Sequence, residues 1–198
     1  MDWRERYERA AARYAAGETR EADERQLVQL GNAAWAAGLC LLELGERADA
    51  AAWLRRSAAA YRRSWEAGAP PDAWGRPIAT IKASLLAGDE ARDAARWALG
   101  AGAAAAESPI GRYAATLALL VLGRDDEAGA LAATLDGDFP QDVAAALRAL
   151  AAGDADAYAT AVAGVRRTFE ERDAFLEGVP VADTALVLDA LAARRGLV

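Results

Sequence analysis

The sequence predicts an all-α protein made of antiparallel helical hairpins, and three observations support this. Alanine, the residue with the highest helix propensity, supplies 56 of the 198 residues. No segment rich in Val, Ile or Thr alternates polar and apolar residues with period two, as a strand does. Four glycines, which we call the turn glycines, each follow an apolar segment and precede a charged residue: Gly45, Gly88, Gly123 and Gly153. Glycine tolerates the left-handed conformation that ends a helix, and Asp or Glu beyond it suits the next helix start, so each turn glycine marks one hairpin.

The N-terminal part of the chain predicts one amphipathic helix. It covers residues 2–16, carries Trp3, Tyr7 and Tyr14 near one face, and ends at Gly17. This helix precedes the first hairpin and lies outside the hairpin pattern.

The first hairpin contains a helix that is apolar over much of its girth. This helix spans residues 21–44, and we expect neighbours on several of its sides. Its two apolar stripes are Leu27, Leu30, Ala34, Ala37, Leu41 and Leu44, and Val28, Trp35, Leu39 and Leu42. The partner helix, residues 48–67, carries one stripe of Leu54, Ala58, Tyr61 and Trp65. Pro70 and Pro71 then break the chain.

Three further hairpins and a last helix follow. The second hairpin spans residues 74–99. The third opens at Ser108 and Pro109, a capping residue followed by proline in the first turn, and ends near Gly137. The fourth opens at residues 138–140, and its second helix carries the stripe Tyr158, Val162, Val165 and Phe169. We therefore expect one domain over residues 1–198, with a first helix at 1–17, four hairpins over 21–171 and a capping helix at 181–195.

The spacing of the hairpins indicates a helical repeat. The turn glycines lie 30 to 43 residues apart, near the period of helix-turn-helix solenoids. The first hairpin carries Gly38, Gly45, Ala50 and Leu54, and the third repeats part of this with Gly123 and Ala128. The second and fourth match at the turn only, and no proline closes the first. On these residues the chain resembles the tetratricopeptide-repeat (TPR) family. The resemblance implies a right-handed stack of hairpins, a TPR-like α-α superhelix, whose first helices line a concave groove that binds peptides or protein segments.

Composition argues against several classes of function. The formal net charge is −7 and the sequence pI is near 4.8, so the chain repels nucleic-acid phosphates. It has no histidine, no phosphate-binding glycine loop and no cysteine cluster, and its single cysteine, Cys40, lies in an apolar helical run. We therefore expect no enzyme activity, no metal and no cofactor. Without an apolar leader or a membrane-length apolar run, we expect a cytoplasmic protein with no membrane partner.

Two arginines occupy matching places at the start of successive first helices. Arg76 follows Trp74 and Gly75, and Arg112 precedes Tyr113, 36 residues further along the chain. An arginine in the first turn opposes the helix dipole. If both face the groove, they form a clamp for a carboxylate or another anion, with the aromatic rings as stacking surfaces. The alternative is a local ion pair for each arginine, with Asp72 or Glu107.

Two more residues join the candidate site. Lys82 is the one lysine in a chain that otherwise uses arginine, and Trp35 lies on the second stripe of the 21–44 helix. The alternative for Lys82 is chance, since a single lysine is weak evidence, and the alternative for Trp35 is core packing. The candidate ligand- or partner-binding residues are thus Trp35, Trp74, Arg76, Lys82, Arg112 and Tyr113.

Three hypotheses for function follow. The leading one is a non-enzymatic TPR-like binding or scaffold protein that recognises a peptide or protein partner through its concave groove. The second is a sensor or enzyme with an enclosed pocket, in which Arg76, Lys82 and Arg112 hold a small anionic ligand. The third is a structural module that self-associates as a homodimer through exposed apolar helix faces. An open groove favours the first, a deep cavity the second, and a large two-fold apolar interface the third.

Overall fold

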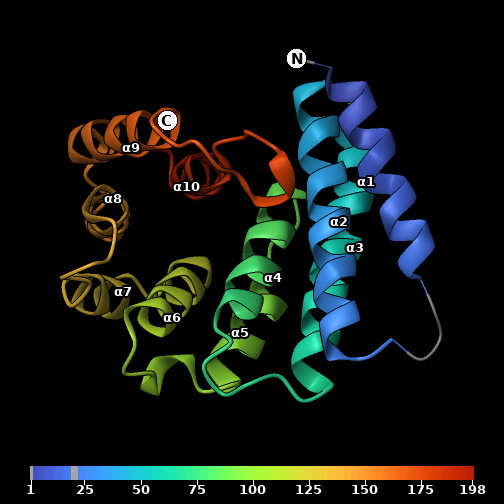
Figure 1. Cartoon of the computed structure of the whole chain (residues 1–198). Coiled ribbons are helices and arrows are strands. Elements are labelled where there is room, and N and C mark those ends of the chain that lie inside the picture. Colours follow the sequence, from blue (N-terminus) through green and yellow to red (C-terminus); the bar gives the residue numbers. More distant parts are fainter. Residues whose placement is uncertain (1, 19–21) are drawn as a thin grey trace. The chain divides into compact units, whose positions relative to one another are not determined.

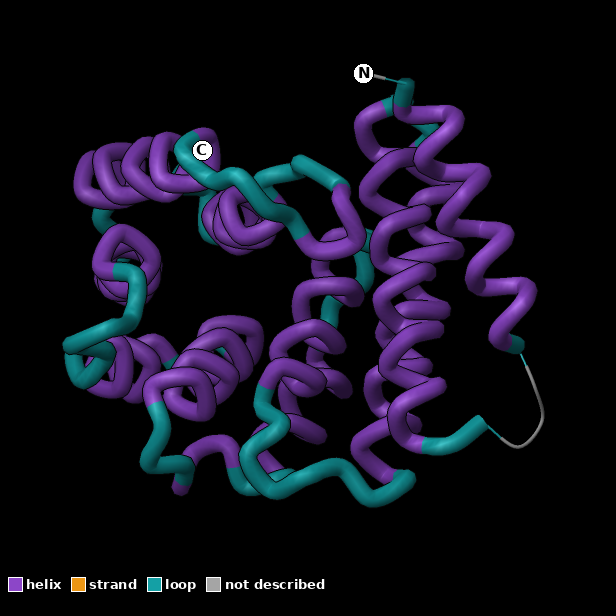
Figure 2. The backbone as a smooth tube through the Cα atoms, in the orientation of Figure 1, coloured by secondary structure: helices purple, strands orange, loops and turns teal. Residues whose placement is uncertain are grey.

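The computed structural model describes residues 2–18 and 22–198, and within them it is all-α. The described chain has ten α-helices, two short 3-10 helices and no strand (Figures 1 and 2). The predicted fold class is therefore confirmed at this level.

The described chain forms two compact units. The first unit holds residues 2–18, 22–89 and 173–181, and the second holds residues 90–172 and 182–198. The boundary falls in the turn of the second predicted hairpin. The expectation of one domain over residues 1–198 stays a prediction.

The first unit contains four α-helices and one 3-10 helix. These are α1 (Trp3–Gly17), α2 (Glu24–Glu43), α3 (Arg47–Glu66), α4 (Gly75–Leu86) and η2 (Leu176–Gly178). Along the chain, α1 packs against α2, α2 against α3, and α3 against α4. Helix α2 begins with a capping box, in which the Asp23 carboxylate accepts from the Gln26 N–H at 2.8 Å and the Gln26 side chain accepts from the Asp23 N–H at 2.9 Å. The helix ends observed here differ from the predicted ones by a few residues.

Helices α2 and α3 cross closely at Gly38. A Cβ added at Gly38 would lie 2.7 Å from Cγ of Leu54 and 3.4 Å from the carbonyl oxygen of Ala50. Leu54 and Ala50 are fully buried. Seven residues earlier in α2, a Cβ added at Gly31 would lie 3.0 Å from the ring of Tyr61 on α3. Residues 33–41 of α2 are all buried, which confirms that this helix has neighbours on several of its sides.

Aromatic residues attach α1 to α3. The ring of Trp53 on α3 meets Tyr7 and Tyr14 of α1 edge-on, with centroid distances of 6.2 and 5.2 Å. The Arg56 guanidinium lies 4.5 Å from the Trp53 centroid. Tyr7 and Tyr14 are seven residues apart and so share one face of α1. Each of them follows an arginine, and these arginines share the neighbouring face.

The second unit contains six α-helices and one 3-10 helix. These are α5 (Arg92–Gly100), η1 (Ala103–Ala105), α6 (Pro109–Leu122), α7 (Asp125–Ala132), α8 (Gln141–Ala152), α9 (Ala155–Glu170) and α10 (Asp183–Arg194). Helices adjacent in sequence pack together from α5 to α9, and α10 packs on α8 and α9. Ser108 caps α6, with Pro109 in the first turn, as predicted. The apolar stripes of the first and fourth hairpins predict burial for four aromatic residues, of which Tyr61 and Tyr158 are buried and Trp65 and Phe169 are half-buried.

The four turn glycines end their helices in the same way. Their φ angles lie between 69° and 80°, in the left-handed region. At each turn the glycine N–H binds the carbonyl three residues back, and the next N–H binds the carbonyl five residues before it, as in Glu46 N to Leu41 O at 2.9 Å and Arg124 N to Leu119 O at 3.0 Å. The prediction from these glycines is confirmed.

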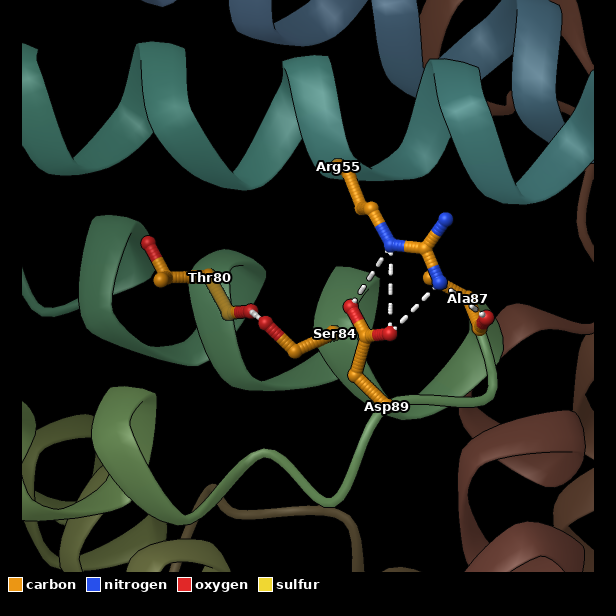
Figure 3. Close-up of polar contacts among 5 residues, drawn as sticks. All are labelled: Arg55, Thr80, Ser84, Ala87 and Asp89. Atoms are coloured by element: carbon orange, nitrogen blue, oxygen red, sulfur yellow. Dashed lines mark hydrogen bonds and ion pairs between the residues drawn. The ribbon is translucent and has the colours of Figure 1, made fainter.

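The acidic residues after the turn glycines do not all cap the next helix. Asp154 caps α9, but Asp89 does not cap α5, which begins three residues later behind Ala91. The Asp89 carboxylate instead binds Arg55 of α3, with the Nη2–Oδ1 distance at 2.6 Å (Figure 3). The same guanidinium reaches the Ala87 carbonyl at the end of α4, at 3.5 Å. This contact joins α3 to the C-terminus of α4.

Candidate ligand-binding site

Arg76 makes its ion pair with another helix rather than with Asp72, the local carboxylate that the alternative interpretation gave it. Its partner is Glu24 at the start of α2, and the two side chains are 13% and 20% exposed. The Nη1 atom of Arg76 is buried and has no hydrogen-bond partner among the described residues. Burial lowers the pKa of this guanidinium from its usual value. The pair therefore joins the first turns of α2 and α4.

Lys82 and Trp35 make a second contact between the same two helices. The Nζ atom of Lys82 lies 5.7 Å from the Trp35 ring centroid, and both residues are buried. The first turns of α2 and α4 pair through Glu24 and Arg76, and points further along each helix pair through Trp35 and Lys82. The two helices therefore run in the same direction. Trp74 is also buried and packs on Trp65, with a centroid distance of 5.3 Å.

The two candidate residues of the second unit lie on α6. The Nη1 atom of Arg112 donates a hydrogen bond to the Thr134 carbonyl at 3.2 Å. Tyr113 is buried against Phe139, with a centroid distance of 5.4 Å, and its hydroxyl has no hydrogen-bond partner among the described residues. Burial raises the pKa of Tyr113 well above its usual value, and the charge of Asp183 adds to this. Arg76 and Arg112 belong to different units, and the clamp that joins them stays a prediction.

A pocket that the sequence did not predict lies in the first unit, and charged and apolar residues line it together. It has a volume of about 420 Å³ and is lined by α1, by Ala36 of α2 and by the segment Asp173–Val181, which we call the strap. The lining residues are Arg6, Arg9, Ala10, Ala12, Arg13, Ala36, Glu177, Gly178 and Val179. Three of them are arginines on α1, and one is a carboxylate on the strap.

Two of these arginines hold the strap. The Arg6 guanidinium donates a hydrogen bond to the Gly178 carbonyl, and Arg13 makes an ion pair with the Glu177 carboxylate. The Glu177 side chain is 17% exposed and that of Arg13 is 52% exposed. Helix α1 thus binds one backbone carbonyl and one side-chain carboxylate of the strap.

The strap presents these groups on a tight turn. The Leu176 carbonyl accepts from the Val179 N–H at 3.1 Å, and the two residues between them have positive φ angles, 57° at Glu177 and 67° at Gly178. Such a turn suits glycine, whereas a residue with a side chain is disfavoured there by about 1–2 kcal/mol. Val179 and Val181 are buried and anchor the segment. Glu177 is therefore held in a strained conformation by its surroundings.

A second pocket continues along α1 and α2. It has a volume of about 390 Å³ and is lined by Arg13, Ala16, Gly17, Gln26, Gln29, Leu30, Ala33 and Glu177. The two pockets share Arg13 and Glu177, so the ion pair stands in the wall between them. We call both together the α1 groove. Its lining combines charged and polar side chains with alanine, leucine and valine side chains.

Sequence reasoning missed this groove for two reasons. Arg6, Arg9 and Arg13 follow the spacing that places residues on one helix face, a signal present in the sequence but overshadowed by the aromatic residues of the same helix. Glu177 lies 164 residues after Arg13, and no local pattern connects them. Within the described chain, no group of three or more Cys, Asp or Glu side chains is placed to hold a metal ion.

The comparisons with protein families, characterised proteins and solved structures found no match for this chain. In the part of the chain that the structure describes, no helix combines the length and the apolar character needed to cross a membrane.

Proposed function

We propose that the protein is a TPR-like binding protein that recognises a short peptide segment of a partner, and that the α1 groove is the binding site. One observation carries this proposal. The chain places a peptide segment of its own, the strap, against α1, where Arg6 takes a backbone carbonyl and Arg13 takes a carboxylate. Groups that bind one peptide in this way suit another, and the pockets on both sides of the ion pair leave room for it.

The TPR-like arrangement is part of the same proposal. Support comes from the shared direction of α2 and α4, which are the first helices of successive hairpins, and from the identical ends at the turn glycines. The groove differs from the sequence-based hypothesis in its walls. Residues 33–41 of α2 are buried, so the accessible walls come from α1, the strap and the first half of α2, which contributes Gln26 and Gln29.

The size of the groove suits a short segment. Its lining runs from Arg6 to Gly17 along α1. At a rise of 1.5 Å per residue this is about 17 Å, the length of about five residues of extended chain. An extended pentapeptide fits along α1 with one side chain in each pocket.

A peptide-display selection tests the proposal. Random heptapeptides are selected on the wild-type protein and on Ala16→Trp, in which an indole fills the second pocket. Ala15→Trp is the matched control, because Ala15 is equally exposed and lines neither pocket. We expect peptides that bind the wild type and Ala15→Trp but not Ala16→Trp, all three proteins having the same circular dichroism and melting temperature. If no peptide distinguishes Ala16→Trp from its control, the groove is not a peptide site.

A further inference from the structure

We propose that the peptide bound in the α1 groove is acidic, and that Glu177 is an internal carboxylate that competes with it. This inference rests on the function proposed above and adds the class of ligand and its regulation. It draws on the charges that line the groove, the partners of each arginine and the conformation of the strap.

The groove is positively charged in an acidic protein. Among the described residues that line the first pocket, three arginines oppose the single carboxylate of Glu177. The whole chain has a formal net charge of −7, so this local excess is opposite in sign to the protein's field. A guanidinium forms paired hydrogen bonds with a carboxylate, which makes an acidic side chain the natural partner of such a lining.

Arg9 is the arginine that the fold leaves to a ligand. Its contact among the described residues is Glu5 on the same helix, at 3.7 Å, and the two side chains are 65% and 64% exposed. That distance is too long for a hydrogen bond, and an exposed pair of this kind contributes little. Arg9 therefore lines the first pocket with no strong competitor from Glu5, while Arg6 and Arg13 are engaged by the strap.

Glu177 illustrates how the groove binds a ligand carboxylate, and it also competes with the ligand for Arg13. Its carboxylate pairs with Arg13 at the wall between the two pockets. It does so from a left-handed backbone position that disfavours any residue with a side chain. A glutamate at this disfavoured backbone position indicates that its ion pair with Arg13 has a functional role. When a ligand carboxylate enters, Arg9 receives it first, and Arg13 is shared with Glu177.

The test uses the display selection with a charge readout and defined variants. The selected peptides are sequenced, and one with a glutamate is synthesised with fluorescein together with its Glu→Gln counterpart. Their affinities are measured by fluorescence anisotropy at 50 and 300 mM NaCl. The proteins are wild type, Arg9→Gln, Glu177→Gln, and the control Arg92→Gln, whose arginine is similarly exposed on α5.

We expect Asp and Glu to be enriched among the selected peptides. The Glu→Gln peptide and Arg9→Gln should each bind about tenfold more weakly, since a hydrogen bond to a charged group is worth about that factor. Glu177→Gln should bind severalfold more tightly, because Arg13 is then released to the ligand. Arg92→Gln should bind as the wild type does, and affinity should fall with salt.

The outcomes separate this inference from the proposed function. Peptides that bind in the groove with no excess of acidic residues, or with equal affinity to wild type and Arg9→Gln, overturn the inference and leave the peptide site standing. If Glu177→Gln weakens binding of the acidic peptide while its melting temperature is unchanged, Glu177 is not a competitor. Absence of any groove-dependent peptide refutes the proposed function itself.

Discussion

Replacing Gly38 with alanine provides a direct test of the packing between α2 and α3. The new Cβ would lie 2.7 Å from Cγ and 2.9 Å from Cδ2 of Leu54, well inside ordinary contact distance. Leu54 is fully buried, so it has no free volume into which to retreat. Gly38→Ala is therefore an overpacking substitution in a tight helix crossing.

The expected magnitude is a balance of two effects. Alanine in place of glycine inside a helix stabilises by about 0.5–1 kcal/mol. Overpacking a close-packed core destabilises by about 1–3 kcal/mol. Gly129 inside α7 isolates the first effect, because a Cβ there would meet only Ala151, at an ordinary 3.5 Å. We expect Gly129→Ala to stabilise the protein and Gly38→Ala to be less stable than Gly129→Ala by about 1–3 kcal/mol.

Guanidinium unfolding followed by circular dichroism and tryptophan fluorescence measures both variants. Five of the six tryptophans belong to the first unit, so their fluorescence reports mainly on the unit that contains the α2–α3 crossing. In the background of Leu54→Ala, which removes the two clashing carbons, Gly38→Ala should lose most of its cost. If Gly38→Ala stabilises as much as Gly129→Ala does, or if the cost persists without the Leu54 side chain, the close crossing is wrong.

Four further predictions concern stability. Tyr158 donates a hydrogen bond to Asp189 at 2.7 Å, whereas the Tyr113 hydroxyl has no partner among the described residues, so Tyr158→Phe should cost about 1.5–3 kcal/mol and Tyr113→Phe close to nothing in chemical denaturation. Burial raises the pKa of both phenols, so these tyrosines ionise at a lower pH in the unfolded chain than in the folded one. The free energy of unfolding should therefore fall as the pH rises above about 10. The double Phe variant should show a smaller fall, and an equal fall would contradict burial as the cause. Glu24→Ala leaves the mostly buried Arg76 charge without its ion-pair partner and should destabilise the protein by about 3 kcal/mol. Asp93→Ala breaks an exposed pair with Arg96 and should destabilise it by less than about 1 kcal/mol. Equal melting temperatures of the two variants would refute this difference. Gly123→Ala introduces a Cβ at a left-handed backbone position, where the added atom would meet no neighbouring side chain within 4 Å. The substitution should therefore destabilise the protein by about 1–2 kcal/mol through backbone strain alone. An unchanged unfolding midpoint would be inconsistent with the φ of 73°.

Local features of the sequence determined the helices and their ends. Each turn glycine adopts the left-handed conformation because its neighbours in sequence form the hydrogen bonds that end the helix. The pairing of Gly38 with Leu54 was also accessible, because the two helices of one hairpin are joined by a short turn and must meet. The stripe that contains Tyr158 predicted its burial by periodicity alone.

Partners distant in the chain were decided by the tertiary structure. The first turn of α4 predicts an unusual position for Arg76 but not its partner, because Glu24 lies 52 residues earlier on another helix. Trp74 looked like a stacking surface for a ligand, and packing placed it against Trp65 instead. The α1 groove depends on the return of the strap, which brings Glu177 to Arg13 across 164 residues. Periodicity shows which face of a helix is apolar. Only the tertiary structure shows which distant segment places a charged residue, such as Glu177, against the polar face.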